Sequence, residues 1–104
     1  MPDTCRVKIS AEASSDIQRI YDYVSQDSPQ NAANLIAKLI DAIDSLEFMP
    51  TRFRKAGRSR SQGTPVHSVV VESFILYYRV DRDVQLVTIM TFRHGHQRQP
   101  RRFP

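Results

Sequence analysis

The sequence predicts a small α+β domain in which a helical hairpin packs on a small antiparallel sheet. The expected order is strand, helix, helix and then three strands. Three observations predict it: a short alternating segment near the start, two helical patterns separated by only about two residues, and three successive β-rich segments. Because 104 residues suffice for one domain, we expect residues 1–104 to form a single domain, of which 93–104 would be a basic C-terminal tail.

The first predicted element is a strand over Cys5–Ser10, because Cys5, Val7 and Ile9 alternate with polar residues. Such alternation is typical of a strand with one buried and one exposed face. Cys5 is the only cysteine, which excludes an intramolecular disulfide and fits a reducing, cytoplasmic setting. Its basic neighbours could lower the thiol pKa, but we favour a buried strand thiol over a reactive one.

Two helices are expected next. Ser10 offers an N-cap for a helix over residues 11–26, in which apolar residues recur at steps of three and four. Ser28 and Pro29 are a second start signal, and the helix that follows should end near Phe48, before Pro50. Its expected apolar stripe consists of Ala33, Ile36, Leu39, Ile40, Ile43 and Leu46. The short connection requires an antiparallel hairpin.

The second half of the chain predicts a loop and then an antiparallel meander. Thr51–Pro65 has two glycines and little hydrophobic periodicity, so we expect a loop or a frayed edge. Three segments rich in β-branched and aromatic residues follow, separated by short turns: Val66–Glu72, Ile75–Asp81 and Val84–Phe92. Because both faces of the last segment are partly apolar, we expect it to be central in the sheet, with the helices on one face and the basic segments framing the other.

Basic residues are concentrated in two segments around these strands. Residues 1–50 hold eight acids and four bases, whereas residues 51–104 hold three acids and eleven bases. Nine of the fifteen basic residues lie in Thr51–Pro65 and Arg93–Pro104, which contain no acid. A basic cluster on one face attracts anionic partners, nucleic acid above all. A solvated basic surface without a partner is the alternative.

Several classes of site have no sequence signature. His94 and His96 are too isolated to indicate a metal site, and we expect neither a metal nor a cofactor. The chain lacks the glycine spacing of a phosphate-binding loop and the nucleophile elbow of a serine hydrolase. No apolar run resembles a signal peptide or approaches the roughly 18–20 residues of a membrane span. We therefore expect a cytoplasmic protein that does not bind membranes.

Arg79 is a charge inside an otherwise apolar predicted strand. Strand alternation places Tyr77 and Arg79 on one face and Tyr78 on the other. A charged side chain seldom lies in the middle of a sheet unless it is paired or faces solvent. One interpretation is a cross-strand ion pair with Glu72. The other is an arginine that binds phosphate, with Tyr77 available for stacking.

His94 directly follows the last predicted strand and could act as a general acid or base, because imidazole titrates near neutral pH. Cleavage of RNA without a metal requires activation of the 2′-hydroxyl, cationic stabilisation of the phosphorane and protonation of the leaving oxygen. Arg79, His94 and either Arg58 or Arg60 could share these tasks. A surface histidine without a catalytic role is the alternative.

These patterns together resemble the RelE/ParE superfamily of toxins from bacterial type II toxin–antitoxin modules, some of which are known as plasmid stabilisation proteins. The resemblance covers nearly the whole chain and depends on the order and spacing of five short motifs. They are A-x-x-D-I-x-x-I-x-x-Y in Ala13–Tyr23, Ser28-Pro29 with Ala32-Ala33, Leu46-x-x-x-Pro50, Tyr78-Arg79-Val80, and Phe92-Arg93-His94-Gly95. It implies the superfamily fold, in which a helical hairpin lies on a small antiparallel sheet.

The ParE branch is more similar than the RelE branch, and it is associated with inhibition of DNA gyrase. The resemblance therefore implies a growth-inhibiting toxin that binds DNA gyrase and forms a hetero-oligomer with a cognate antitoxin. The alternative is a RelE-type, ribosome-dependent endonuclease acting on mRNA, with Arg79 and His94 as catalytic residues. No tyrosine follows His94 and no glutamate base is evident in the central loop, so enzymatic activity is the less favoured reading. A degenerate member that only binds an antitoxin is a third possibility.

The residues expected to contact the antitoxin or the target are Arg54, Arg58, Arg60, Tyr77, Arg79, Arg93 and His94. We expect the tail Gln97–Pro104 to be extended, because its two prolines oppose a helix. Deleting it should leave thermal stability nearly unchanged and should weaken toxicity or target binding, most strongly at low salt.

Overall fold

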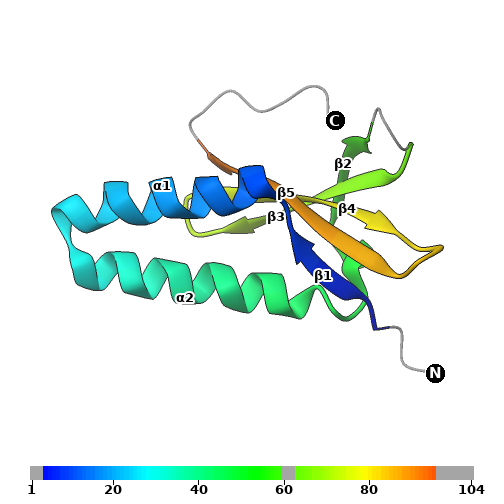
Figure 1. The fold of residues 1–104 in the computed structure, drawn as a ribbon, viewed down its shortest axis with the longest axis horizontal. Coiled ribbons are helices and arrows are strands. Elements are labelled where there is room, and N and C mark those ends of the chain that lie inside the picture. Colours follow the sequence, from blue (N-terminus) through cyan, green and yellow to red (C-terminus); the bar gives the residue numbers. More distant parts are fainter. Residues whose placement is uncertain (1–3, 60–62, 96–104) are drawn as a thin grey trace.

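Two helices pack as an antiparallel hairpin against one face of a five-stranded sheet (Figure 1). The computed structural model describes residues 4–59 and 63–95, so Arg60 and the tail Gln97–Pro104 lie outside the described residues. The elements are β1 (Arg6–Ile9), α1 (Ala11–Asp27), α2 (Pro29–Ser45), a 3₁₀ turn (Pro50–Arg52), β2 (Arg54–Arg58), β3 (Pro65–Val71), β4 (Phe74–Asp81) and β5 (Leu86–His94). The predicted α+β class and the expected elements are confirmed, and β2 is an additional strand.

The strand order is β1-β5-β4-β3-β2, and β3, β4 and β5 form the predicted antiparallel meander. The last strand, β5, was expected to be central; it is an interior strand next to the central strand β4. The sheet is mixed rather than antiparallel, however, because β1 pairs in parallel with β5. The two helices between β1 and the later strands form a connection long enough for parallel pairing.

The segment predicted as a loop or frayed edge contains the edge strand β2. It pairs antiparallel with β3, and its register shifts between Lys55 and Gly57. Exposed edge strands are often short, charged and bulged, which prevents pairing with other chains. Because β2 is a charged and mostly exposed edge strand, its sequence lacks the hydrophobic alternation that would have predicted a strand.

Three predicted boundaries were wrong by two residues or more. The last strand begins at Leu86 rather than Val84, because the preceding turn extends to Gln85, which has a positive φ of 51°. It then continues to His94, so Arg93 and His94 belong to the sheet and not to the tail. The second helix ends at Ser45 rather than near Phe48, and Met49 adopts the left-handed conformation at φ 45°.

The two predicted N-caps are present. The hydroxyl oxygen of Ser10 accepts a hydrogen bond from the Ala13 N–H at 3.1 Å, and that of Ser28 accepts one from the Asn31 N–H at 3.2 Å. Each satisfies a donor that the first helical turn leaves without a partner. The Ser10 hydroxyl also donates to the carbonyl of Met90 at 3.0 Å, so the start of α1 is attached to β5.

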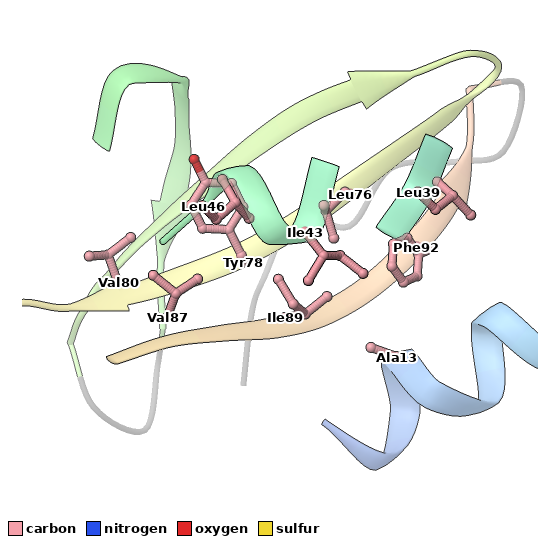
Figure 2. Packing of buried hydrophobic residues seen from close by; sticks show 10 residues of the cluster. All are labelled: Ala13, Leu39, Ile43, Leu46, Leu76, Tyr78, Val80, Val87, Ile89 and Phe92. Carbon is pink, nitrogen blue, oxygen red and sulfur yellow. The ribbon is translucent and has the colours of Figure 1, made fainter. Parts of the chain in front are cut away.

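The main core lies between the helices and the sheet. Figure 2 shows Leu39 and Ile43 of α2, together with the C-cap residue Leu46, facing residues of β4 and β5. The cluster consists of Ala13, Leu39, Ile43, Leu46, Leu76, Tyr78, Val80, Val87, Ile89 and Phe92. Half-buried Cys5 packs against it, as a structural thiol would. The buried stripe of α2 is narrower than predicted, because Ala32 replaces Ala33 in it and Ile40 is largely exposed.

A second, smaller cluster lies on the opposite face of the sheet, where Val66, Tyr77 and Met90 pack together with Ile75. Its position confirms the predicted alternation in β4, with Tyr78 facing the helices and Tyr77 facing away from them. Within the described residues, no helix has the length and apolar character needed to cross a membrane.

Candidate functional site: the open face of the sheet

The face of the sheet opposite the helices, here called the open face, carries most of the residues that the sequence singled out. Residues directly paired on neighbouring strands point to the same face. Tyr77 pairs with Ser68 of β3, and Ser68 pairs with Arg54 of the edge strand β2. Arg54 and Tyr77 therefore lie in one row across the open face.

Arg79 lies in the next row. It is paired with Val66 on one side and with Thr88 of β5 on the other, and Thr88 is paired with Lys8 of β1. The parallel pairing of β1 thus adds a cation that the sequence analysis did not include. On the other side of the Tyr77 row, Arg93 lies opposite Ile75.

Tyr77 is the centre of this arrangement. Its side chain is only 6% exposed because it packs against Val66 and Met90. Burial raises the pKa of its hydroxyl, while the positive charges of Arg93 and Arg54 act in the opposite direction. Both guanidinium groups are therefore close enough to influence the hydroxyl. The ring is covered, so Tyr77 does not offer a surface on which a base could stack.

The ion-pair interpretation of Arg79 was wrong. Glu72 forms its salt bridge with Lys38 of α2 instead. Between residues 4–59 and 63–95 the other salt bridge joins Arg19 and Asp16, again on the helical side. Neither of them neutralises a cation of the open face.

His94 lies on the opposite face from Arg79. It is paired with Phe74, whose ring it meets edge-on with centroids 5.1 Å apart. Phe74 and Arg79 are five residues apart on β4, which corresponds to about 17 Å along the strand. Arg79 and His94 are therefore not brought together around one point.

Arg58 lies at the far end of the β2–β3 hairpin, paired with Pro65, where its guanidinium donates to the carbonyl of Gly63 at 2.9 Å. It belongs to the rim of the sheet rather than to the row of Arg54 and Tyr77. No group of three His, Cys, Asp or Glu side chains in the described part of the chain is arranged to hold a metal ion.

Comparisons with known proteins identify the family. The sequence model described as "ParE toxin of type II toxin-antitoxin system, parDE" matches residues 7–99. This chain belongs to the ParE toxin family. A curated relative, "Putative toxin Y4kP" of Sinorhizobium fredii, is 32% identical over 95 residues, which cover 91% of this chain and 93% of the relative.

Solved structures share the fold of this ParE-family chain. The chromosomal ParDE toxin–antitoxin system of P. aeruginosa has a TM-score of 0.67 at 22% identity, covering 88% of this chain and 97% of that one. The archaeal RelE–RelB complex of Pyrococcus horikoshii has a TM-score of 0.64 at 15% identity, covering 91% and 99%. The RelBE2 complex of Mycobacterium tuberculosis has a TM-score of 0.57 at 23% identity, covering 88% and 91%.

The ParE-family chain also has a groove of about 820 Å³ between α1 and the end of β5, at the edge of the sheet that β1 leaves uncovered. Phe74, His94 and Arg93 line it on the sheet side, and Glu12, Arg19 and Tyr23 line it on α1. At its base the buried carboxylate of Asp16 accepts hydrogen bonds from the Thr91 hydroxyl at 2.7 Å and the Phe92 N–H at 3.0 Å. Asp16 holds α1 against β5 and so shapes this groove.

Sequence reasoning missed Lys8, Arg6 and Asp16. The signal for Asp16 was its position three residues after Ala13, on the stripe of α1 that faces the sheet. The two basic residues of β1 had no such signal, because their relation to Arg79 depends on which strand β1 pairs with.

Proposed function

We propose that this chain is the growth-inhibiting toxin of a type II module, that it acts in the cytoplasm by binding DNA gyrase, and that a cognate antitoxin neutralises it. The observation that carries the proposal is the match to the ParE toxin family over residues 7–99. The cations of the open face supply a surface suited to a macromolecular target, since Arg54, Arg79 and Arg93 are held on rigid strands.

The geometry favours binding over RNA cleavage. A nuclease needs its acid, base and cationic stabiliser around one phosphate. Arg79 and His94 lie on opposite faces, about 17 Å apart along β4. Asp81 is the one carboxylate among the described strand residues of the open face, and its Oδ1 already accepts the Asp83 N–H at 3.2 Å.

A test in cells separates the two mechanisms. If the chain poisons gyrase, inducing it should stall replication and start a DNA-damage response, while mRNA on ribosomes stays intact. The purified chain should also inhibit supercoiling by gyrase. New cuts within translated codons, detected by primer extension and abolished by His94→Ala, would overturn the gyrase proposal.

The antitoxin should cover the open face. The solved proteins of this fold include a ParDE system and two RelE–RelB type complexes, and a partner that brings carboxylates to Arg54, Arg79 and Arg93 would neutralise their charge. Co-expression with the product of a neighbouring short gene should restore growth and give a stable complex. Recovery of the chain alone, harmless and at high yield, argues against this part of the proposal.

A further inference from the structure

Positive charge is distributed along the whole length of the open face. Successive rows that point to one face of a strand are two residues apart, about 6.7 Å. Four successive rows each carry a cation: Arg93 beside Ile75, Arg54 in the row of Tyr77, Arg79 with Lys8, and Arg6 beside Leu86 and Asp81. The mixed topology produces this series, because it adds two basic residues from β1.

In the described part of the protein none of these five cations forms a salt bridge, although the Asp81 carboxylate lies two strands from Arg6 in the same row. The two salt bridges of the described part, Arg19–Asp16 and Lys38–Glu72, both lie on the helical side. Arg79 is half-buried between Val66 and Thr88. A partly buried cation without a carboxylate is costly to the fold, so its position favours a role in binding an anion.

The same face lacks what recognition of single-stranded nucleic acid uses. Proteins that bind unpaired bases stack them on exposed aromatic rings. Tyr77 is the aromatic residue that the described strands place on this face, and it is only 6% exposed. Around it lie cations and the half-buried Ser68, residue types that commonly contact phosphates and sugars without regard to sequence.

We propose that the open face binds the sugar–phosphate backbone of double-stranded DNA without reading its sequence. The inference deepens the proposed function and rests on it for its biological setting: the chain would contact the DNA on which gyrase acts as well as the enzyme. A surface on which five cations extend over four rows and four strands suits a phosphodiester backbone, in which one charge recurs at every nucleotide.

The test is binding of the purified full-length chain to a fluorescently labelled short DNA duplex of arbitrary sequence, measured by anisotropy at several salt concentrations. If all five cations contact phosphates, a fourfold rise in salt should lower the affinity by roughly 10²- to 10³-fold. Lys8 and Arg54 are exposed, so replacing them should not disturb the fold. Lys8→Gln and Arg54→Gln should each reduce the slope of the log of the binding constant against the log of the salt concentration by about 0.9. Arg79→Gln should do the same.

Lys38→Gln is the matched control, because it removes one positive charge from α2, on the opposite side of the molecule. It should leave the slope unchanged. Equal effects of Lys38→Gln and Arg54→Gln would overturn the inference, as would tighter binding of a single-stranded RNA than of the duplex, or no duplex binding at low salt.

Failure of this inference can be distinguished from failure of the proposed function. Inhibition of gyrase by a chain that does not bind duplex DNA would contradict the DNA contact alone. Conversely, salt-dependent duplex binding that Lys8→Gln and Arg54→Gln weaken, without any effect on gyrase, would support the surface and contradict gyrase as the target.

Discussion

Asp16 is a buried acid that ties the first helix to the sheet. Its Oδ2 accepts both the Thr91 hydroxyl and the Phe92 N–H, and its Oδ1 pairs with Arg19. Phe92 lies beyond the part of β5 that β1 covers, so its N–H has no strand partner on that side. The carboxylate therefore takes the place of a sheet hydrogen bond.

We expect Asp16→Ala to lower the free energy of unfolding by about 2–4 kcal/mol, because it leaves the Thr91 hydroxyl and the Phe92 N–H buried without an acceptor. Asp16→Asn should cost clearly less, because its side-chain oxygen can still accept both bonds and the lost partner, Arg19, is largely exposed. Urea unfolding of the two variants measures the difference. Equal losses of unfolding free energy in the two variants would mean that Asp16 stabilises the fold through its negative charge and not as a hydrogen-bond acceptor.

Tyr78 is another buried polar group with a defined partner. Its hydroxyl donates to the carbonyl of Pro50, and its ring stacks on His67 with centroids 5.7 Å apart. Burial raises the pKa of Tyr78 to about 12, and the charge of Arg52 opposes this only in part. The neutral hydroxyl thus anchors the 3₁₀ turn that joins α2 to β2.

This pKa predicts a loss of stability at alkaline pH. The unfolded chain loses the Tyr78 proton near pH 10, whereas the native protein keeps it until about pH 12. The contribution of Tyr78 to the free energy of unfolding is therefore fully present below pH 10. It should decrease by about 2–3 kcal/mol as the pH rises from 10 to 12. Tyr78→Phe should be less stable at neutral pH and should lack this part of the alkaline loss in denaturant titrations at a series of pH values.

At the scale of the elements, the two helices begin with the same type of cap but are anchored differently. Ser10 and Ser28 each accept a backbone hydrogen bond, but only the Ser10 hydroxyl also donates to β5, at the carbonyl of Met90. Ser28→Ala should therefore cost about 1 kcal/mol, the usual value for an N-cap. Ser10→Ala should cost about 1 kcal/mol more, because it also removes a bond between helix and sheet. Thermal unfolding of the two alanine variants provides the comparison.

The elements that the sequence predicted correctly are those with strong local signals. Ser10, Ser28 and Pro29 marked both helix starts, and the alternation around Tyr77 and Tyr78 assigned the two faces of β4. What could not be predicted depends on long-range pairing. The polar edge strand β2 has no hydrophobic pattern of its own, and the direction of β1 is decided by its partner, about 80 residues away in the chain.

The candidate site shows the same division. Tyr77 and Arg79 were placed on one face by a rule that uses only their spacing. His94 was assigned to the same site because it follows the last strand, but β5 extends two residues further than predicted and His94 pairs with Phe74 on the helical side. Lys8 was missed because only the observed register brings it to Thr88, next to Arg79.

Across the whole molecule, burial is greatest in the middle of the sheet and declines toward both edges. Leu76, Tyr78, Val87 and Ile89 are fully buried, whereas most of β2 is exposed. Backbone amides at the centre of β4 and β5 should therefore exchange hydrogen only through global unfolding, and those of β2 should exchange through local opening. Amide exchange measured by NMR tests this order. Equal protection of β2 and β5 would show that the sheet opens as one unit.

The parallel pairing of β1 with β5 also has a consequence for synthesis. Among the described strands, β1 is paired with β5 alone, and the β5 residues Leu86–His94 follow about 80 residues later in the chain. Because translation proceeds at about 5–20 residues per second, the N-terminal segment waits several seconds for its partner. Lys8 cannot join Arg79 before β5 has been synthesised, so we expect shorter nascent chains to lack the row that contains Lys8 and Arg79.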